Sequence, residues 1–143
     1  MRVQSVCPLV FAGLLLGCSA SGPSRAAVSG TVKLNGQPVD EGSIQFIPVE
    51  GTTGPGVGGI IKNGQYQIPQ AKGVMVGKNR VELRAIKKTG KKIQDPTKPQ
   101  GVLVDQMGQA FPPEYNDDST LVREIKAEDN IVNFDIKAKG SGK

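Results

Sequence analysis

Short runs of alternating apolar and polar residues, separated by glycines and prolines, constrain the fold of this chain most. The alternation is clearest in residues 28–34 and 132–138. A period of two is typical of strands that turn one face to a core and the other to solvent. The 19 glycines and 10 prolines punctuate such runs and do not form a low-complexity tract. Because no segment after residue 26 has a helical period, the sequence predicts an all-β fold.

Five further segments have strand character, at residues 43–49, 56–61, 65–69, 78–87 and 121–127. Asn63-Gly64 lies between two of them and predicts a tight hairpin, since both residues tolerate positive φ. Asn35-Gly36 predicts a second reversal after the first strand. We therefore expect a sandwich of about seven antiparallel strands. This domain should span residues 27–139, with residues 140–143 as a disordered tail.

The first 17 residues have the pattern of an export signal. Arg2 precedes an apolar stretch from Val6 to Leu16, which is shorter than the roughly 20 residues of a spanning helix. The following Leu15-Leu16-Gly17-Cys18 resembles the lipobox of bacterial lipoproteins. That resemblance implies cleavage between Gly17 and Cys18, a diacylglycerol on the Cys18 thiol and often an acyl chain on its amine.

Small and polar residues from Ser19 to Ala26 follow this cysteine. We expect residues 18–26 to be the lipidated cysteine and a flexible tether. Two or more acyl chains hold a protein stably on a membrane. Ser19 directly after Cys18 is similar to the outer-membrane pattern of Gram-negative lipoproteins. The expected location is the cell envelope, at the outer membrane or its periplasmic face, with the leaflet left open.

Several segments of the domain resemble carboxypeptidase regulatory-like domains, which have a transthyretin-like (prealbumin-like) sandwich. The segments are residues 28–39, 42–48, 63–66 and 77–81. Residues 112–121 and 133–135 are similar to the ending of many small lipoproteins of planctomycete-type bacteria. The chain departs from the family pattern at two positions. Asn63 stands where the family usually has an acidic residue before the hairpin glycine, and the aromatic residue that usually lies two positions after the glycine at Gly77 is missing. The resemblance implies an architecture and no catalytic residues.

The composition excludes much of enzyme chemistry. The chain has no histidine, and its two cysteines are Cys7 and Cys18. The domain therefore lacks the residues for a disulfide, a thiolate or imidazole metal site, or a Ser/His or Cys/His catalytic pair. We expect no cofactor and no metal site.

Residues 78–98 hold eight basic residues against Glu82 and Asp95. Among them are Lys87, Lys88, Lys91 and Lys92. These lysines predict a patch for anionic lipid head groups, an acidic wall polymer or an acidic protein. The alternative is a solvated strand face running into an exposed loop. Because no aromatic residue lies among them to stack on bases, we do not expect nucleic acid binding.

Residues 89–116 form the longest stretch without strong strand signals, although Val102–Val104 has the character of a short strand. Long loops are uncommon unless they are functional or disordered. Phe111 and Tyr115 lie in this stretch and predict a contact surface. The alternative is that Pro112–Tyr115 only packs the loop onto the sandwich.

Three functions remain open. The first is a non-enzymatic envelope lipoprotein whose domain serves as an adaptor or assembly factor for an unknown envelope protein. The second is a carbohydrate- or cell-wall-binding module, against which the absence of tryptophan counts. The third is a hydrolase. The transthyretin-like fold includes a family of hydrolases, whose chemistry resembles one that uses His and Arg. Because this chain has no histidine, a hydrolase ranks third.

Overall fold

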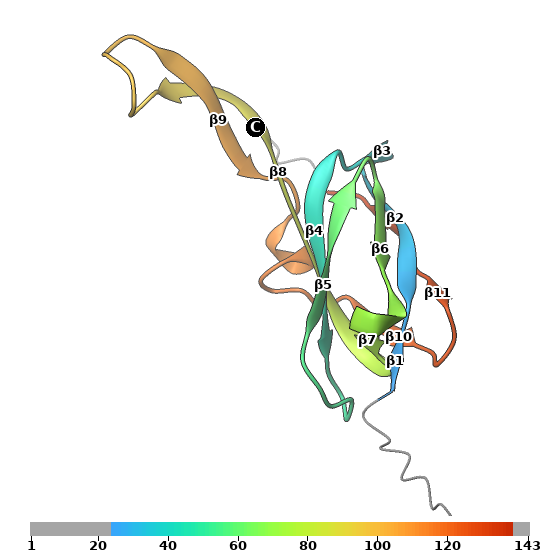
Figure 1. The fold of residues 1–143 in the computed structure, drawn as a ribbon. Helices are drawn as coiled ribbons and strands as arrows, with labels where there is room; N and C mark the ends of the chain where they lie inside the picture. The colour runs from blue at the N-terminus through green and yellow to red at the C-terminus, as the bar shows by residue number, and fades with distance from the viewer. Residues whose placement is uncertain (1–23, 139–143) are drawn as a thin grey trace, which may run out of the picture.

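A computed structural model describes residues 24–138 of the chain (Figure 1). The strands are β1 (Arg25–Ala26), β2 (Val28–Leu34), β3 (Gln37–Pro38), β4 (Glu41–Pro48), β5 (Val57–Lys62), β6 (Gln65–Ile68), β7 (Val74–Met75), β8 (Gly77–Gln94), β9 (Leu103–Gln109), β10 (Val122–Ile125), β11 (Asn130–Ile131) and β12 (Phe134–Ile136). Two short 3-10 helices, η1 (Gln70–Lys72) and η2 (Pro113–Tyr115), complete it. The expected all-β class is confirmed, and each of the seven expected strands overlaps an observed one.

The main sheet curls on itself into a sandwich-like body. Its strands follow the order β10-β8-β4-β5-β6-β2-β11, and β12 also pairs with β2. β5 and β6 share one registered pair, Lys62 with Gln65, so the sheet turns there. Phe46 of β4, Tyr66 of β6 and Phe134 of β12 meet inside, with ring centroids 6.3 and 6.4 Å apart for successive pairs. The alternating apolar residues of both sides thus form one core.

Two strands depart from the expected antiparallel arrangement. β11 and β12 both run parallel to β2, with Asn130 opposite Val28 and Phe134 opposite Val32. The chain leaves β10, which pairs with β8, and crosses to the other side of the core before it reaches β2. A crossing connection brings a strand in parallel, whereas a hairpin brings it in antiparallel. Alternation alone does not distinguish the two directions.

The two predicted reversals are confirmed. Asn63 and Gly64 have φ angles of 50° and 73° and join β5 to β6. Asn35 and Gly36, with φ angles of 53° and 79°, join β2 to β3. Asparagine and glycine are the residues that adopt this left-handed conformation at least cost.

The ordered body begins before the expected boundary at residue 27. Arg25 and Ala26 form β1 and pair with Met75 and Val74 of β7. Ala26 is buried, so this part of the expected tether belongs to the domain. The predicted signal peptide (residues 1–17) with Gly17, Cys18 and residues 19–23 of the tether, and the tail (residues 140–143), lie outside the described residues.

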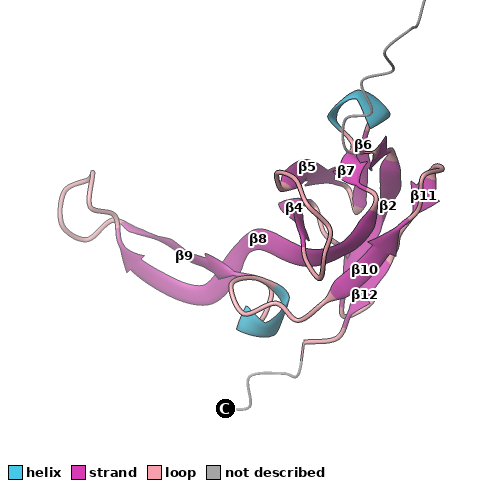
Figure 2. Cartoon of the chain, turned by 90° about the horizontal axis from the view of Figure 1, so that it is seen from below, coloured by secondary structure: helices cyan, strands magenta, loops and turns pink. Residues whose placement is uncertain are grey.

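The largest difference from expectation lies in residues 89–116, where the end of β8 and the whole of β9 replace much of the expected loop. β8 continues past the body and pairs with β9, from Ile86 opposite Gln109 to Gln94 opposite Leu103. This hairpin, residues 86–109, projects from the body (Figures 1 and 2), and we call it the arm. Its strands were missed, apart from the segment at Val102–Val104, because neither face meets a core and no alternation results.

Candidate functional site

The arm carries most of the exposed apolar side chains of the described residues. Eight large apolar residues are exposed, and six of them lie on the arm: Ile86, Ile93, Val102, Leu103, Val104 and Met107. The other two are Ile60 and Ile131. A cluster of exposed apolar side chains is typical of an interaction site. The arm is therefore the first candidate binding surface.

Strand register divides these side chains between two faces of the arm. Directly opposite residues share a face, and so do residues two apart along a strand. Lys88 lies opposite Met107, and Lys92 lies opposite Asp105. Both lysines form ion pairs with Asp105, at 2.7 and 3.7 Å, as expected of one shared face.

This face, which we call the outer arm face, contains the three most exposed apolar residues of the arm. They are Ile86, Leu103 and Met107, with exposed fractions of 67%, 55% and 53%. Ile93 and Val104 lie opposite each other on the other face, and their exposed fractions are lower, at 44% and 37%. The apolar surface is thus uneven, and the outer arm face presents more of it to solvent.

A hollow of about 460 Å³ lies at the base of the outer arm face. It is lined by Glu41, Gly42, Ser43, Arg84, Ile86 and Met107. The pairing of β4 with β8 ends at Gly42 and Ala85, and from Ile86 onward β8 pairs with β9 alone among the described strands. The hollow therefore opens where β4 leaves the sheet and β8 continues.

The base of the arm is fixed by a row of charges. The Arg84 guanidinium donates to Glu82 at 2.9 Å and to Asp117 at 2.7 Å, and Arg80 donates to Glu82 at 3.0 Å. Both hydrogen bonds raise the pKa of Arg84, and the one to Asp117 has the larger effect. Arg84 therefore stays charged beside the hollow and is oriented by two carboxylates.

The four predicted patch lysines all lie on the arm and are exposed. The hydrogen bond from Lys88 lowers the pKa of Asp105 and raises that of Lys88 itself. Lys87 and Lys91 have no carboxylate within ion-pair distance among the described residues. All four lysines lie on one hairpin, but Lys87, opposite Gly108, is on the face away from Lys88 and Lys92, and Lys91 lies within the register shift between those two.

The tip of the arm is ordered by its own hydrogen bonds. Asp95 Oδ1 accepts from the backbone N–H of Thr97 at 2.9 Å and from its hydroxyl at 2.7 Å. These bonds lower the pKa of Asp95. The Asp95 N–H donates to the carbonyl oxygen of Val102 at 2.9 Å, which closes the turn. The arm thus holds a defined shape without a core.

Phe111 does not form the predicted contact surface, because its ring is buried in the core at 2% exposure. Tyr115 is half-buried and packs against the same core. Asn116 Nδ2 donates to the carbonyl oxygens of Phe111 and Pro112, at 3.0 and 3.3 Å. The alternative interpretation, that this segment packs onto the sandwich, describes it correctly. The buried Asn116 was not singled out from the sequence, where it carried no signal beyond a turn residue.

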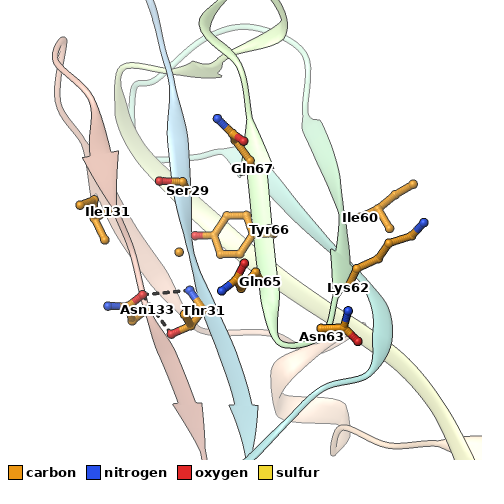
Figure 3. Close-up of a pocket in the computed structure, with 11 residues that line it drawn as sticks. Ser29, Thr31, Ile60, Lys62, Asn63, Gln65, Tyr66, Gln67, Ile131 and Asn133 are labelled. Atoms are coloured by element: carbon orange, nitrogen blue, oxygen red, sulfur yellow. Dashed lines mark hydrogen bonds between the residues drawn. The ribbon is translucent and has the colours of Figure 1, made fainter.

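A second candidate surface is a shallow groove of about 880 Å³ across β2, β6 and the segment after β11 (Figure 3). Its lining includes uncharged polar side chains at Ser29, Thr31, Gln65, Gln67 and Asn133, and the exposed Ile60 and Ile131. Asn133 Oδ1 accepts from the N–H and the hydroxyl of Thr31, at 2.9 and 3.1 Å. Sequence patterns do not indicate this groove, because its residues come from strands far apart in the chain.

Comparison of the chain with protein-family models, with curated proteins and with solved structures finds no match. Within residues 24–138 no helix has the length and apolar character to cross a bilayer. The same residues contain no group of three or more His, Cys, Asp or Glu side chains able to hold a metal ion.

Proposed function

We propose that this chain is an exported, lipid-anchored envelope lipoprotein whose non-enzymatic domain is an adaptor, with the arm as its binding element. The Leu15–Cys18 segment supports the anchor, because it follows an apolar stretch of signal-peptide length. The sandwich-like body supports the further proposal that the domain is of the transthyretin-like, carboxypeptidase regulatory-like type.

The observation that carries the adaptor proposal is the exposed apolar surface of the arm. Six large apolar side chains stand in solvent on a hairpin that contributes none of the fully buried side chains. Exposure of such surface to water is unfavourable by about 25 cal/mol per Å². A contact with another molecule removes this cost, and the ordered tip lowers the entropy lost on binding.

β1, the first described strand, and the arm lie at opposite ends of the molecule. Cys18 precedes Ser24 by six residues, which span at most about 20 Å when fully extended. β1 begins directly after Ser24, and Figure 1 shows it at the end of the body away from the arm. An anchored domain therefore presents the arm away from its own membrane.

The anchor and the adaptor role are tested in intact cells. Full-length protein is compared with a Cys18→Ser variant for incorporation of labelled palmitate and for membrane fractionation. It is also compared with a variant in which Asn-Gly replaces residues 88–107. Lys87 and Gly108 lie opposite each other, so a two-residue turn joins them without strain.

We expect label on the wild-type protein and none on the Cys18→Ser variant. After crosslinking, we expect one envelope protein to be captured with the wild type and lost with the short arm. Absence of label contradicts the lipid anchor. Equal capture by the short-arm variant contradicts the adaptor role of the arm.

A second candidate function, binding of a cell-wall polymer, is favoured by the polar groove alone. Amide and hydroxyl side chains such as Gln65, Gln67 and Ser29 supply hydrogen bonds to sugars without charge. Retention of the purified domain on isolated cell wall tests it. This function predicts loss of retention with Gln65→Ala and Gln67→Ala and no effect of the short arm.

A further inference from the structure

We infer that the outer arm face, together with the hollow at its base, docks an extended acidic segment of a partner protein. The inference rests on the proposed adaptor function and names the face, the mode and the chemistry of the partner. Three observations carry it: the placement of the apolar side chains, the hollow, and the charge of the arm.

The apolar side chains are placed as a docking stripe along one face. Ile86 and Met107 lie at its base and Leu103 lies near its tip, with Lys88 and Lys92 between them. The register of β8 with β9 shifts between Lys88 and Lys92, so the apolar side chains form two groups, Ile86 with Met107 at the base and Leu103 near the tip. An extended segment lying along the arm meets the two groups in turn.

The hollow supplies an anchoring pocket for this segment. Ile86 and Met107 form its apolar wall, and Glu41, Ser43 and Arg84 supply polar groups beside them. Arg84 is held in place by Glu82 and Asp117. A single buried anchor side chain surrounded by weaker contacts is the usual arrangement of a protein interface.

The net positive charge of the arm favours an acidic segment of the partner. The arm carries five lysines against Asp95 and Asp105, whereas the other described residues carry ten basic and eleven acidic side chains. On the outer arm face Lys88 and Lys92 share one carboxylate, that of Asp105, and so keep a net positive charge. Lys87 on the other face, together with Lys91 and Lys98, has no carboxylate within ion-pair distance among the described residues, and these three lysines add to the positive charge of the arm. Carboxylates on the partner therefore complement the arm and speed encounter.

A protein fits this surface better than a wall polymer or the anchoring bilayer. Polar polysaccharides offer nothing to match Ile86, Leu103 and Met107. The bilayer that would hold Cys18 lies at the opposite end of the molecule from the arm, given a linker of at most about 20 Å. A partner protein supplies both the apolar and the acidic groups.

Site-specific photocrosslinking in cells tests the inference with the full-length protein. The probe p-benzoylphenylalanine replaces Leu103 or Met107 on the outer arm face, Val104 on the other face, or Ile131 at the groove. All four side chains are exposed, so the probe is open to a partner at each position. The adduct is mapped by mass spectrometry to a segment of the partner, and that segment is synthesised as a peptide.

We expect adducts to one protein at residues 103 and 107, few at 104 and none at 131, with a mapped segment rich in Asp and Glu. The synthetic peptide should bind the purified domain more weakly as salt increases. Met107→Ser should weaken this binding about tenfold, as for the loss of one buried apolar side chain. Ile131→Ser is the matched control and should leave it unchanged.

Each other result overturns the inference. Adducts mainly at residue 104 contradict the outer arm face as the docking face, but leave the arm as the binding element. Adducts only at 131 overturn both the inference and the adaptor proposal. Adducts to lipid or polymer, a mapped segment without acidic residues, or no adduct from normally folded and abundant protein also overturn it. Thermal unfolding of each variant shows whether it is folded.

Discussion

The hydroxyl of Tyr66 donates a hydrogen bond to the main-chain carbonyl oxygen of Val132 at 2.7 Å. Tyr66 lies on β6, and its ring lies in the core near Phe46 and Phe134. Val132 lies between β11 and β12, where the chain crosses past Gly30. A β-carbon at Gly30 would lie 1.9 Å from the same carbonyl oxygen, so the close approach requires glycine. One side chain thus ties the C-terminal segment to the core.

Replacing Tyr66 with phenylalanine keeps the ring and removes this hydrogen bond. The carbonyl oxygen of Val132 then loses a partner in a partly buried position. We expect the free energy of unfolding to fall by about 1 kcal/mol. Urea unfolding measures it, and Tyr115→Phe, at a half-buried tyrosine for which the structure shows no side-chain hydrogen bond among the described residues, is the control. An unchanged midpoint would show that the bond adds nothing to stability.

Tyr66 also predicts a pH dependence of stability. Burial raises the pKa of its phenol above the ordinary value of 10.0, and Arg123 opposes this only in part. Because the pKa is higher in the folded state, the stabilising contribution is fully present below about pH 10 and is lost as the pH rises above it. Unfolding measured between pH 8 and 11.5 should show a steeper decline in the wild type than in Tyr66→Phe. Parallel curves would contradict the assignment.

Substitution by alanine should affect stability very differently at Phe111 and at Met107, although the two residues are only four positions apart. Phe111 is 2% exposed and belongs to the core, whereas Met107 is 53% exposed on the arm. We expect Phe111→Ala to lower the free energy of unfolding by about 3–5 kcal/mol. Met107→Ala should change it by less than about 0.5 kcal/mol. Chemical denaturation of both variants measures the difference, and similar values would place Phe111 outside the core.

Alanine substitutions at two turn glycines distinguish the cost of backbone strain from the cost of a steric contact. Gly36 and Gly64 have similar φ angles, 79° and 73°. A β-carbon at Gly36 meets nothing within 4 Å, whereas at Gly64 it would lie 2.7 Å from Pro38 Cβ. Alanine at either position should cost about 1–2 kcal/mol for the left-handed backbone. We expect Gly64→Ala to cost more than Gly36→Ala in thermal unfolding, and equal costs would contradict the contact.

The short-arm variant predicts that the body folds without the arm. None of the fully buried side chains belongs to residues 88–107. We expect their replacement by Asn-Gly to change the free energy of unfolding by less than about 1 kcal/mol. Calorimetry measures this directly. A large loss of stability would mean that the arm supports the body, and binding defects of the variant would then have no separate meaning.

Local sequence signals predicted the elements of the body well. Strand alternation at Val28–Leu34 and the Asn63-Gly64 turn were sufficient, because each signal depends on residues close in the chain. The same reasoning failed for the arm, where β8 and β9 pair with each other in solvent and no buried face imposes a pattern. It also misplaced Phe111, because nothing local indicates that the chain returns to the core after the arm.

The sequence by itself determined the all-β class, the two tight reversals and the absence of histidine chemistry, since these follow from composition and neighbouring residues. It also placed Lys87 and Lys88 in a basic cluster. Only the tertiary structure decided that the cluster stands on a projecting hairpin, that Ile86 and Met107 share a face above a hollow, and that β11 and β12 run parallel to β2. These relationships depend on pairing between distant segments, and pairing is set by how the whole chain buries its apolar surface.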